Sequence, residues 1–86
     1  MTNILITGAS QGIGRATAIE AAKKKSFVGI NYSKNSDAAE SCLETVKSCG
    51  GNGVVLQCDV ADNNAVKEMF QKFVGMCGTI DGVFNN

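Results

Sequence analysis

The chain contains no histidine, no proline and no tryptophan, and its formal net charge is zero because 8 basic residues balance 8 acidic ones. A neutral chain has nothing to steer it toward nucleic acid or an anionic membrane surface. No apolar run approaches the ~20 residues of a membrane-spanning helix, and no basic segment followed by an apolar one marks a secretory signal. We therefore expect a cytoplasmic protein without a nucleic-acid or membrane partner.

Metal ligands at useful spacings are also lacking. The 4 cysteines are Cys42, Cys49, Cys58 and Cys77. Their spacings match neither a zinc site nor a Cys-x-x-Cys redox motif, and no histidine is available as a further ligand. We interpret the cysteines as small hydrophobic residues in a reducing compartment, and we expect no metal.

What the chain does have is a regular alternation of short apolar runs, which indicate strands, and apolar residues at helical spacing, which indicate helices. Strands are expected at residues 3–7, 27–32, 54–58 and 80–85, and helices at residues 12–24, 36–49 and 63–76. This alternation is typical of βαβ units. It predicts an α/β fold with a parallel sheet and helices on both faces. By analogy with the N-terminal half of the Rossmann-type three-layer fold, the expected parallel sheet order is 3-2-1-4.

Local signals mark the ends of the expected helices. Ser36 is expected to cap the second helix, with Asp37 in the first turn, where the helix dipole favours an anion. The glycine-rich residues 50–53 are expected to end that helix, because glycine tolerates a left-handed backbone. Asp62 or Asn63 is expected to cap the third helix.

The segment Thr7–Gly14 reads TGASQGIG and places three glycines between the first strand and the first helix. Glycine permits a tight turn and a close approach of the backbone to a ligand. The N-terminus of a helix offers N–H groups and a partial positive charge to phosphate, and Ser10 adds a hydroxyl donor. Because the glycines follow a strand and open a helix, we interpret the segment as a phosphate-binding loop in preference to a bare turn.

This segment resembles the TGxxxGxG motif of classical short-chain dehydrogenases/reductases. Further agreement comes from residues 31–33 (NYS), residues 58–60 (CDV) and residues 81–86 (DGVFNN), the last of which resembles the approach to the family's NNAG motif. The resemblance covers essentially the whole chain in order. The chain is most similar to 3-oxoacyl-carrier-protein reductases and NADP-type sugar or polyol dehydrogenases, which implies hydride transfer between a nicotinamide cofactor and a carbonyl or alcohol carbon.

The end of the second strand bears on the choice of cofactor. An acid about 20 residues beyond the glycines holds the ribose 2′-OH of NAD in the general pattern, but Tyr32 stands here, followed by Ser33 and Lys34. The lack of a carboxylate favours NADP, with NAD as the alternative, and Arg15 adds positive charge at the start of the first helix. Gln11 departs from the Arg or Lys that many NADP-preferring relatives carry.

The resemblance implies contacts at the other end of the cofactor as well. The Asp59 carboxylate accepts from the adenine amino group, Val60 packs nearby, and Asn85 and Asn86 border a cofactor ribose; the alternatives are a solvated loop acid at Asp59 and fraying of the asparagine pair. The complete set of expected cofactor-binding residues is Gly8, Ser10, Gln11, Gly12, Ile13, Gly14, Tyr32, Ser33, Lys34, Asp59, Val60, Asn85 and Asn86.

The family's catalytic serine and Tyr-x-x-x-Lys motif are missing, since the one tyrosine, Tyr32, is followed four positions on by Ser36. We therefore expect residues 1–86 to be a partial NAD(P)-binding Rossmann domain, truncated before the catalytic segment, with no catalytic residue. The resemblance implies that the parent protein is a homo-oligomer whose contacts come from later helices.

Two other interpretations account for the same loop. One is a non-catalytic module that binds NADP or a protein partner. The other is an S-adenosylmethionine-dependent methyltransferase, which also has a glycine-rich first loop but normally has an acid at the end of the second strand, where this chain has Tyr32.

Overall fold

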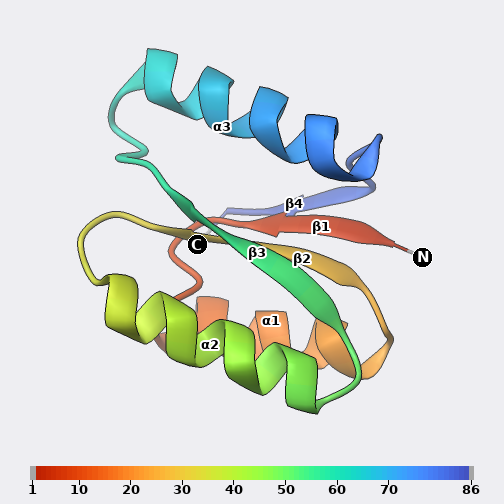
Figure 1. Ribbon diagram of the computed structural model, residues 1–86. Helices are drawn as coiled ribbons and strands as arrows, with labels where there is room; N and C mark the ends of the chain where they lie inside the picture. The colour runs from red at the N-terminus through yellow and green to blue at the C-terminus, as the bar shows by residue number, and fades with distance from the viewer. Residues whose placement is uncertain (1, 86) are drawn as a thin grey trace.

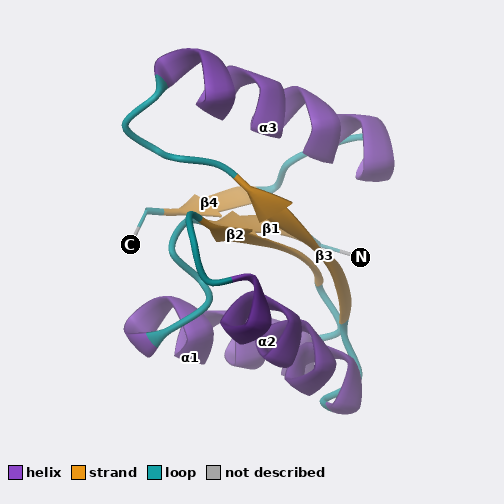
Figure 2. Ribbon diagram, turned by 60° about the vertical axis from the view of Figure 1, so that its left-hand side comes forward, coloured by secondary structure: helices purple, strands orange, loops and turns teal. Residues whose placement is uncertain are grey.

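The computed structural model describes residues 2–85 and shows one parallel sheet between two layers of helices (Figures 1 and 2). The strands are β1 (Asn3–Ile6), β2 (Phe27–Tyr32), β3 (Asn52–Gln57) and β4 (Gly82–Phe84), and the helices are α1 (Gly12–Lys23), α2 (Ser36–Ser48) and α3 (Asn63–Cys77). The strand order is β3-β2-β1-β4, with every neighbouring pair parallel. The expected fold class and strand order are confirmed.

The sheet separates two apolar cores. Helices α1 and α2 cover one face and α3 covers the other, as Figure 2 shows edge-on. Because successive side chains of a strand point to opposite faces, Ile6 belongs to the core under α1 and α2, whereas Leu5 belongs to the core under α3. Both residues are fully buried. A sheet covered on both faces explains why β1 and most of β2 are apolar without alternation.

Gly29 in β2 allows α3 to pack closely against the sheet. A Cβ atom at this position would lie 2.7 Å from Cδ1 of Leu5 and 2.8 Å from Cε1 of Phe73. Phe73 is fully buried, and its ring stacks on Phe27 with 5.7 Å between the ring centroids. The missing side chain at position 29 therefore makes the space that the Phe73 ring fills.

The ends of the elements differ from expectation in a few places. Ser36 is the first residue of α2 rather than its cap, because the Asn35 side chain accepts a hydrogen bond from the N–H of Ala38 at 3.0 Å. Gly50 ends α2 with a φ of 95°, but β3 already begins at Asn52, which pairs with Phe27. The expected strands at residues 3–7, 54–58 and 80–85 are correspondingly shifted or shorter.

The third helix begins as expected. The carboxylate of Asp62 accepts hydrogen bonds from the N–H groups of Asn64 and Ala65, so of the two residues considered, Asp62 is the cap. An acid at this position also interacts favourably with the helix dipole.

We predict that Gly29→Ala destabilises the fold by about 1–3 kcal/mol, because the added methyl group overpacks the core between Leu5 and Phe73. The matched control is Gly75→Ala in α3, where an added Cβ meets nothing within 4 Å and alanine raises helix stability by about 0.5–1 kcal/mol. Urea unfolding followed by circular dichroism measures both changes. Equal stability of the two variants would contradict the packing assigned to Gly29.

Candidate nucleotide-binding groove

A groove of about 600 Å³ opens at the carboxyl ends of β1 and β2, between the loop that precedes α1 and the loop that precedes α2. Parallel strands place their carboxyl ends at one edge of a sheet, which is where ligands bind in open α/β folds. The residues that line the groove are Gly8, Ser10, Gln11, Gly12, Ile13, Tyr32, Ser33, Lys34 and Asn35. The structure therefore brings together the expected residues of the first two loops, apart from Gly14.

The N-terminus of α1 faces this groove without a side-chain cap. Gln11 occupies the cap position and makes no side-chain hydrogen bond to the helix, and the first turn carries no acid. The first bond of the helix ladder runs from Arg15 N to Gln11 O at 3.3 Å. The N–H groups of residues 12–14 precede that bond, so they are the donors that helix geometry leaves for an anion.

The other two helices make the contrast clear. Asn35 caps α2 and Asp62 caps α3, each through a side-chain oxygen that accepts a backbone N–H. A side-chain cap typically stabilises a helix by about 0.5–2 kcal/mol. Among the helices of residues 2–85, α1 is thus the one without a side-chain cap.

The glycines of the loop have different local roles. Gly8 and Gly12 have φ values of 62° and 60°, a left-handed conformation that other residues rarely adopt. Gly14 is buried within α1 and does not line the groove. Ile13, in contrast, is 69% exposed beside the same N–H groups, so an apolar side chain is available to a ligand at this point.

Backbone and side-chain bonds hold the loop from both neighbouring strands. On the β2 side, Gly8 N donates to Asn31 Oδ1 at 3.1 Å, and Ala9 N donates to Asn31 O at 3.0 Å. On the β4 side, Thr7 N donates to Phe84 O at 3.0 Å. The loop therefore has a fixed position relative to the sheet before any ligand binds.

Asn31 is a site residue that sequence reasoning missed. It is 2% exposed, and it stands in the otherwise largely apolar run FVGINY of β2. A buried polar side chain must satisfy its hydrogen bonds inside the protein. A lone amide near the carboxyl end of an apolar strand was the available signal.

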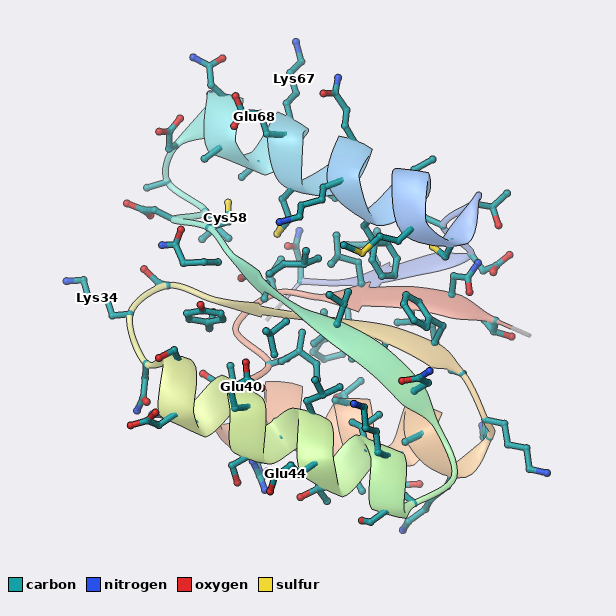
Figure 3. The ribbon with its side chains drawn as sticks, in the orientation of Figure 1. Lys34, Glu40, Glu44, Cys58, Lys67 and Glu68 are labelled. Carbon is teal, nitrogen blue, oxygen red and sulfur yellow. The ribbon has the colours of Figure 1, made fainter. Side chains whose placement is uncertain are left out.

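The second loop supplies the charge of the groove. Tyr32 is half-buried, whereas Ser33, Lys34 and Asn35 are exposed. Lys34 is the one charged residue among those that line the groove, and Figure 3 shows its side chain extending outward from the loop between β2 and α2. Gln57 Nε2 donates to Ser33 O at 3.0 Å, which ties this loop to the end of β3.

Arg15 does not add its charge to the groove, contrary to expectation. Its Nη2 donates to the hydroxyl of Thr45 at 3.2 Å. Thr45 lies in the second half of α2, so the guanidinium bridges the two helices. The direction of a long side chain depends on which neighbour it meets, and the sequence alone did not reveal that neighbour.

Asp59 and Val60 follow β3 and lie outside the lining of the groove. Asp59 Oδ1 accepts from Ala61 N at 2.9 Å, and Val60 is 54% exposed. Asp59 instead borders a separate hollow of about 380 Å³ beside α3. Whether these two residues contact adenine stays a prediction.

The same hollow reaches Cys58, which lies at the end of β3 and below α3 (Figure 3). Burial raises the pKa of the Cys58 thiol, and the carboxylates of Asp59, Asp62 and Glu68 raise it further. The thiol is therefore protonated at neutral pH and is a weak nucleophile and a weak metal ligand. Within residues 2–85, no three His, Cys, Asp or Glu side chains gather as a metal site.

The asparagine pair that follows β4 is only partly described. The Asn85 side chain accepts a hydrogen bond from the Thr7 hydroxyl at 3.3 Å, so it meets the start of the glycine loop. Asn86 lies outside the described residues.

In residues 2–85, no helix has the length and apolar character needed to span a membrane.

A parallel α/β sheet with a glycine loop and an open helix N-terminus at its carboxyl edge defines a dinucleotide-binding type of domain. The family model of the short chain dehydrogenases matches residues 2–86 of this chain. The chain belongs to this family, which excludes the methyltransferase interpretation.

Two curated relatives illustrate the match. The chain is 39% identical over 82 residues to the short-chain dehydrogenase/reductase homolog YusS of Bacillus subtilis, with 95% of this chain and 75% of YusS covered. It is 39% identical over 82 residues to the 3-oxoacyl-(acyl-carrier-protein) reductase FabG of Staphylococcus epidermidis, of which it covers 34%. The chain thus spans most of the first relative but only about a third of the second.

Two solved structures show the same fold with different cofactors. The NADH-dependent reductase A1-R′, complexed with NAD, is 33% identical with a TM-score of 0.92, and the match covers 99% of this chain and 35% of that one. A dehydrogenase from Burkholderia cenocepacia with bound NADP is 25% identical with a TM-score of 0.91, and the match covers 98% and 33%. The fold is therefore compatible with either dinucleotide.

We predict that Gly12→Ala weakens dinucleotide binding about tenfold or more, because the added Cβ projects beside the open N–H groups of α1. The matched control is Gly50→Ala. Both glycines have positive φ and open space around the added Cβ, so both variants lose about 1–2 kcal/mol of stability. Only the first lies in the groove. Calorimetric titration measures the dinucleotide affinity of both variants. Equal losses of affinity would contradict the assignment of the groove as the binding site.

Proposed function

We propose that this chain is the N-terminal, cofactor-binding part of an NADP-dependent short-chain oxidoreductase, and that residues 1–86 form a partial domain that binds the cofactor without catalysing hydride transfer. The observation that carries the proposal is the uncapped N-terminus of α1, which opens onto a groove whose one charged residue is Lys34. A helix N-terminus binds the pyrophosphate of a dinucleotide in this type of fold.

The preference for NADP follows from the charge of the second loop. Among residues 2–85, no carboxylate lines the groove, and Lys34 lies two residues beyond the end of β2. A carboxylate here would repel a 2′-phosphate, whereas a lysine and a serine hydroxyl attract and hydrogen-bond one. The relatives bind NAD in one case and NADP in another, so the residues of this chain have to supply the argument.

The remaining expected residues complete the proposed mode of binding. The N–H groups of residues 12–14 hold the pyrophosphate, and Ser33 and Lys34 hold the 2′-phosphate. Asp59 and Val60 meet the adenine, and Asn85 and Asn86 border a ribose. When bound, the cofactor supplies hydride chemistry, and the chain's own residues bind and orient it.

A non-catalytic binding module is the second candidate. The match to YusS and the match to FabG each extend over 82 residues, which cover 75% of YusS but only 34% of FabG. Among the relatives there is therefore a protein much shorter than FabG that is named a homolog of the family. A chain of this kind binds a cofactor or a partner with the same groove.

For either candidate we propose a cytoplasmic location, supported by four cysteines that form no disulfide.

We predict that the chain binds NADPH more tightly than NADH, and that Lys34→Glu lowers NADPH affinity about tenfold while leaving NADH affinity nearly unchanged. The reason is that the reversed charge faces only the 2′-phosphate. The control is Lys67→Glu, an equal change of charge on α3, where the side chain points away from the sheet (Figure 3). Isothermal titration with both cofactors gives the four affinities.

Equal binding of NADPH and NADH by the unmodified chain would sink the NADP proposal. A loss of NADPH affinity in both lysine variants would show a long-range charge effect instead of a local contact. High salt provides a further check, because it weakens a contact between exposed charges.

We predict that the purified chain gives no turnover when carbonyl substrates and NADPH are supplied, because Tyr32 is its one tyrosine and is followed at the fourth position by Ser36. Consumption of NADPH is measured at 340 nm, with a complete short-chain reductase as the positive control. Turnover above the blank that tracks the chain through purification would overturn the non-catalytic part of the proposal.

A further inference from the structure

We propose that Asn31 is a positioning residue that fixes the spacing between the glycine loop and the end of β3, and so couples the two parts of the cofactor site. This inference rests on the proposed function, because the two parts are those assigned to the pyrophosphate and the adenine. Asn31 itself lies beneath the groove and lines neither it nor the hollow beside α3.

The Asn31 side chain forms a fork between the two segments. Its Oδ1 accepts from Gly8 N at 3.1 Å. Its Nδ2 donates to Leu56 O and to Cys58 O, both at 3.2 Å. An N–H on one side and two carbonyl groups on the other fix the orientation of the amide, because the reverse orientation would place like groups together.

The Asn31 side chain bonds to residues that lie beyond the last register pairs of β2 with its two neighbouring strands. The last register pair of β1 with β2 is Ile6 with Ile30, and the last pair of β2 with β3 is Tyr32 with Gln57. Gly8 and Cys58 both lie beyond these pairs. One backbone bond on each side continues past these pairs, from Ala9 N to Asn31 O at 3.0 Å and from Cys58 N to Tyr32 O at 2.9 Å. The Asn31 side chain adds a direct link between the two segments themselves, where few backbone bonds remain to set their separation.

Only an amide side chain of this length both accepts a hydrogen bond from the glycine loop and donates hydrogen bonds to the carbonyl groups at the end of β3. A carboxylate accepts from Gly8 N but repels the carbonyl oxygens of Leu56 and Cys58. Leucine has the same branching of heavy atoms, although it is larger, and it makes none of these hydrogen bonds. A ligand that touches both loops requires their correct separation, so a change in that separation lowers the affinity for such a ligand more than for a ligand that touches only one loop.

A matched amide stands at the opposite edge of the sheet. Asn3 is 8% exposed, and its Nδ2 donates to Cys77 O at 3.3 Å and to Thr79 O at 3.1 Å. It ties the start of β1 to the turn between α3 and β4. Asn3→Leu therefore removes a comparable buried fork without touching either cofactor loop, and it serves as the control for Asn31→Leu.

The experiment compares a ligand that spans both loops with ligands that contact one. NADPH is the spanning ligand, inorganic pyrophosphate tests the glycine loop, and adenosine tests the end of β3. Binding is followed by amide chemical shifts in NMR titrations, which also report whether each variant is folded. Asn31→Leu is expected to lower NADPH affinity about tenfold to a hundredfold, while the affinities for pyrophosphate and adenosine change less than about threefold. Asn3→Leu is expected to leave all three affinities unchanged.

A pH series with Asn31→Asp supplies a second readout. Burial raises the pKa of the introduced carboxyl, and the protonated form can donate to one of the two carbonyl groups while its other oxygen accepts from Gly8 N. The NADPH affinity of this variant, relative to the unmodified chain at each pH, is expected to recover as the pH falls from 8 to 5. A ratio that stays flat across this range would overturn the proposal.

Two further outcomes separate the possible failures. If the unmodified chain does not bind NADPH, the proposed function fails and the coupling has no site to act on. If it binds NADPH but Asn31→Leu weakens all three ligands equally, Asn31 is a general structural residue and the inference is wrong.

The unmodified chain gives an independent measurement should a variant not fold. Pyrophosphate binding is expected to shift the Asn31 side-chain amide and the Asp59 backbone amide together. A shift confined to the glycine loop would contradict the coupling.

Discussion

The parallel pairing of β1 with both β2 and β4 is the constraint on which the rest of the structure depends. It places the carboxyl ends of all strands at one edge, so that loops distant in sequence meet there. It also requires a crossover helix between successive strands, and these helices cover both faces of the sheet. Strands that are covered on both faces consist mostly of apolar residues, and the polar loops that form the groove lie together at the shared edge.

The groove departs from the rules that stabilise the rest of the chain. Helices α2 and α3 have side-chain caps, whereas α1 has none. The loop before α1 contains left-handed glycines, and an isoleucine is 69% exposed there. Local choices that weaken a fold usually mark the place where a ligand completes it. In this chain these departures occur together at one helix N-terminus, which supports the proposed binding site over scattered irregularity.

Much of this arrangement could be predicted from the sequence. The alternation of elements predicted the parallel sheet with helices on both faces, and analogy with the Rossmann fold supplied the strand order. The loop Thr7–Gly14 was recognisable because it follows a strand and opens a helix. The cap at Asp62 was also expected. These features depend on local chemistry or on rules of chain connection, both of which one sequence contains.

Features that depend on tertiary neighbours were not predictable in the same way. Asn35 and Ser36 are both good caps, and only the path of the chain into α2 decides between them. Arg15 has the length to reach several partners, and the packing of α1 on α2 selects Thr45. Asn31 was recognisable as polar, but its partners distant in sequence come from two segments more than 20 residues away on either side.

The two buried asparagines show how this small domain holds its binding edge in place. Asn3 secures the amino end of β1 to the segment that leads into β4, and Asp81 reinforces it by accepting from Asn3 N at 2.8 Å. At the other end, Asn31 links the glycine loop to β3. Because β4 has only 3 residues, the bonds of Asn3 and Asp81 supplement its short ladder at the amino end. The Asn31 amide supplements the few backbone bonds between the glycine loop and the end of β3, and so helps to set the separation of these loops at the carboxyl edge.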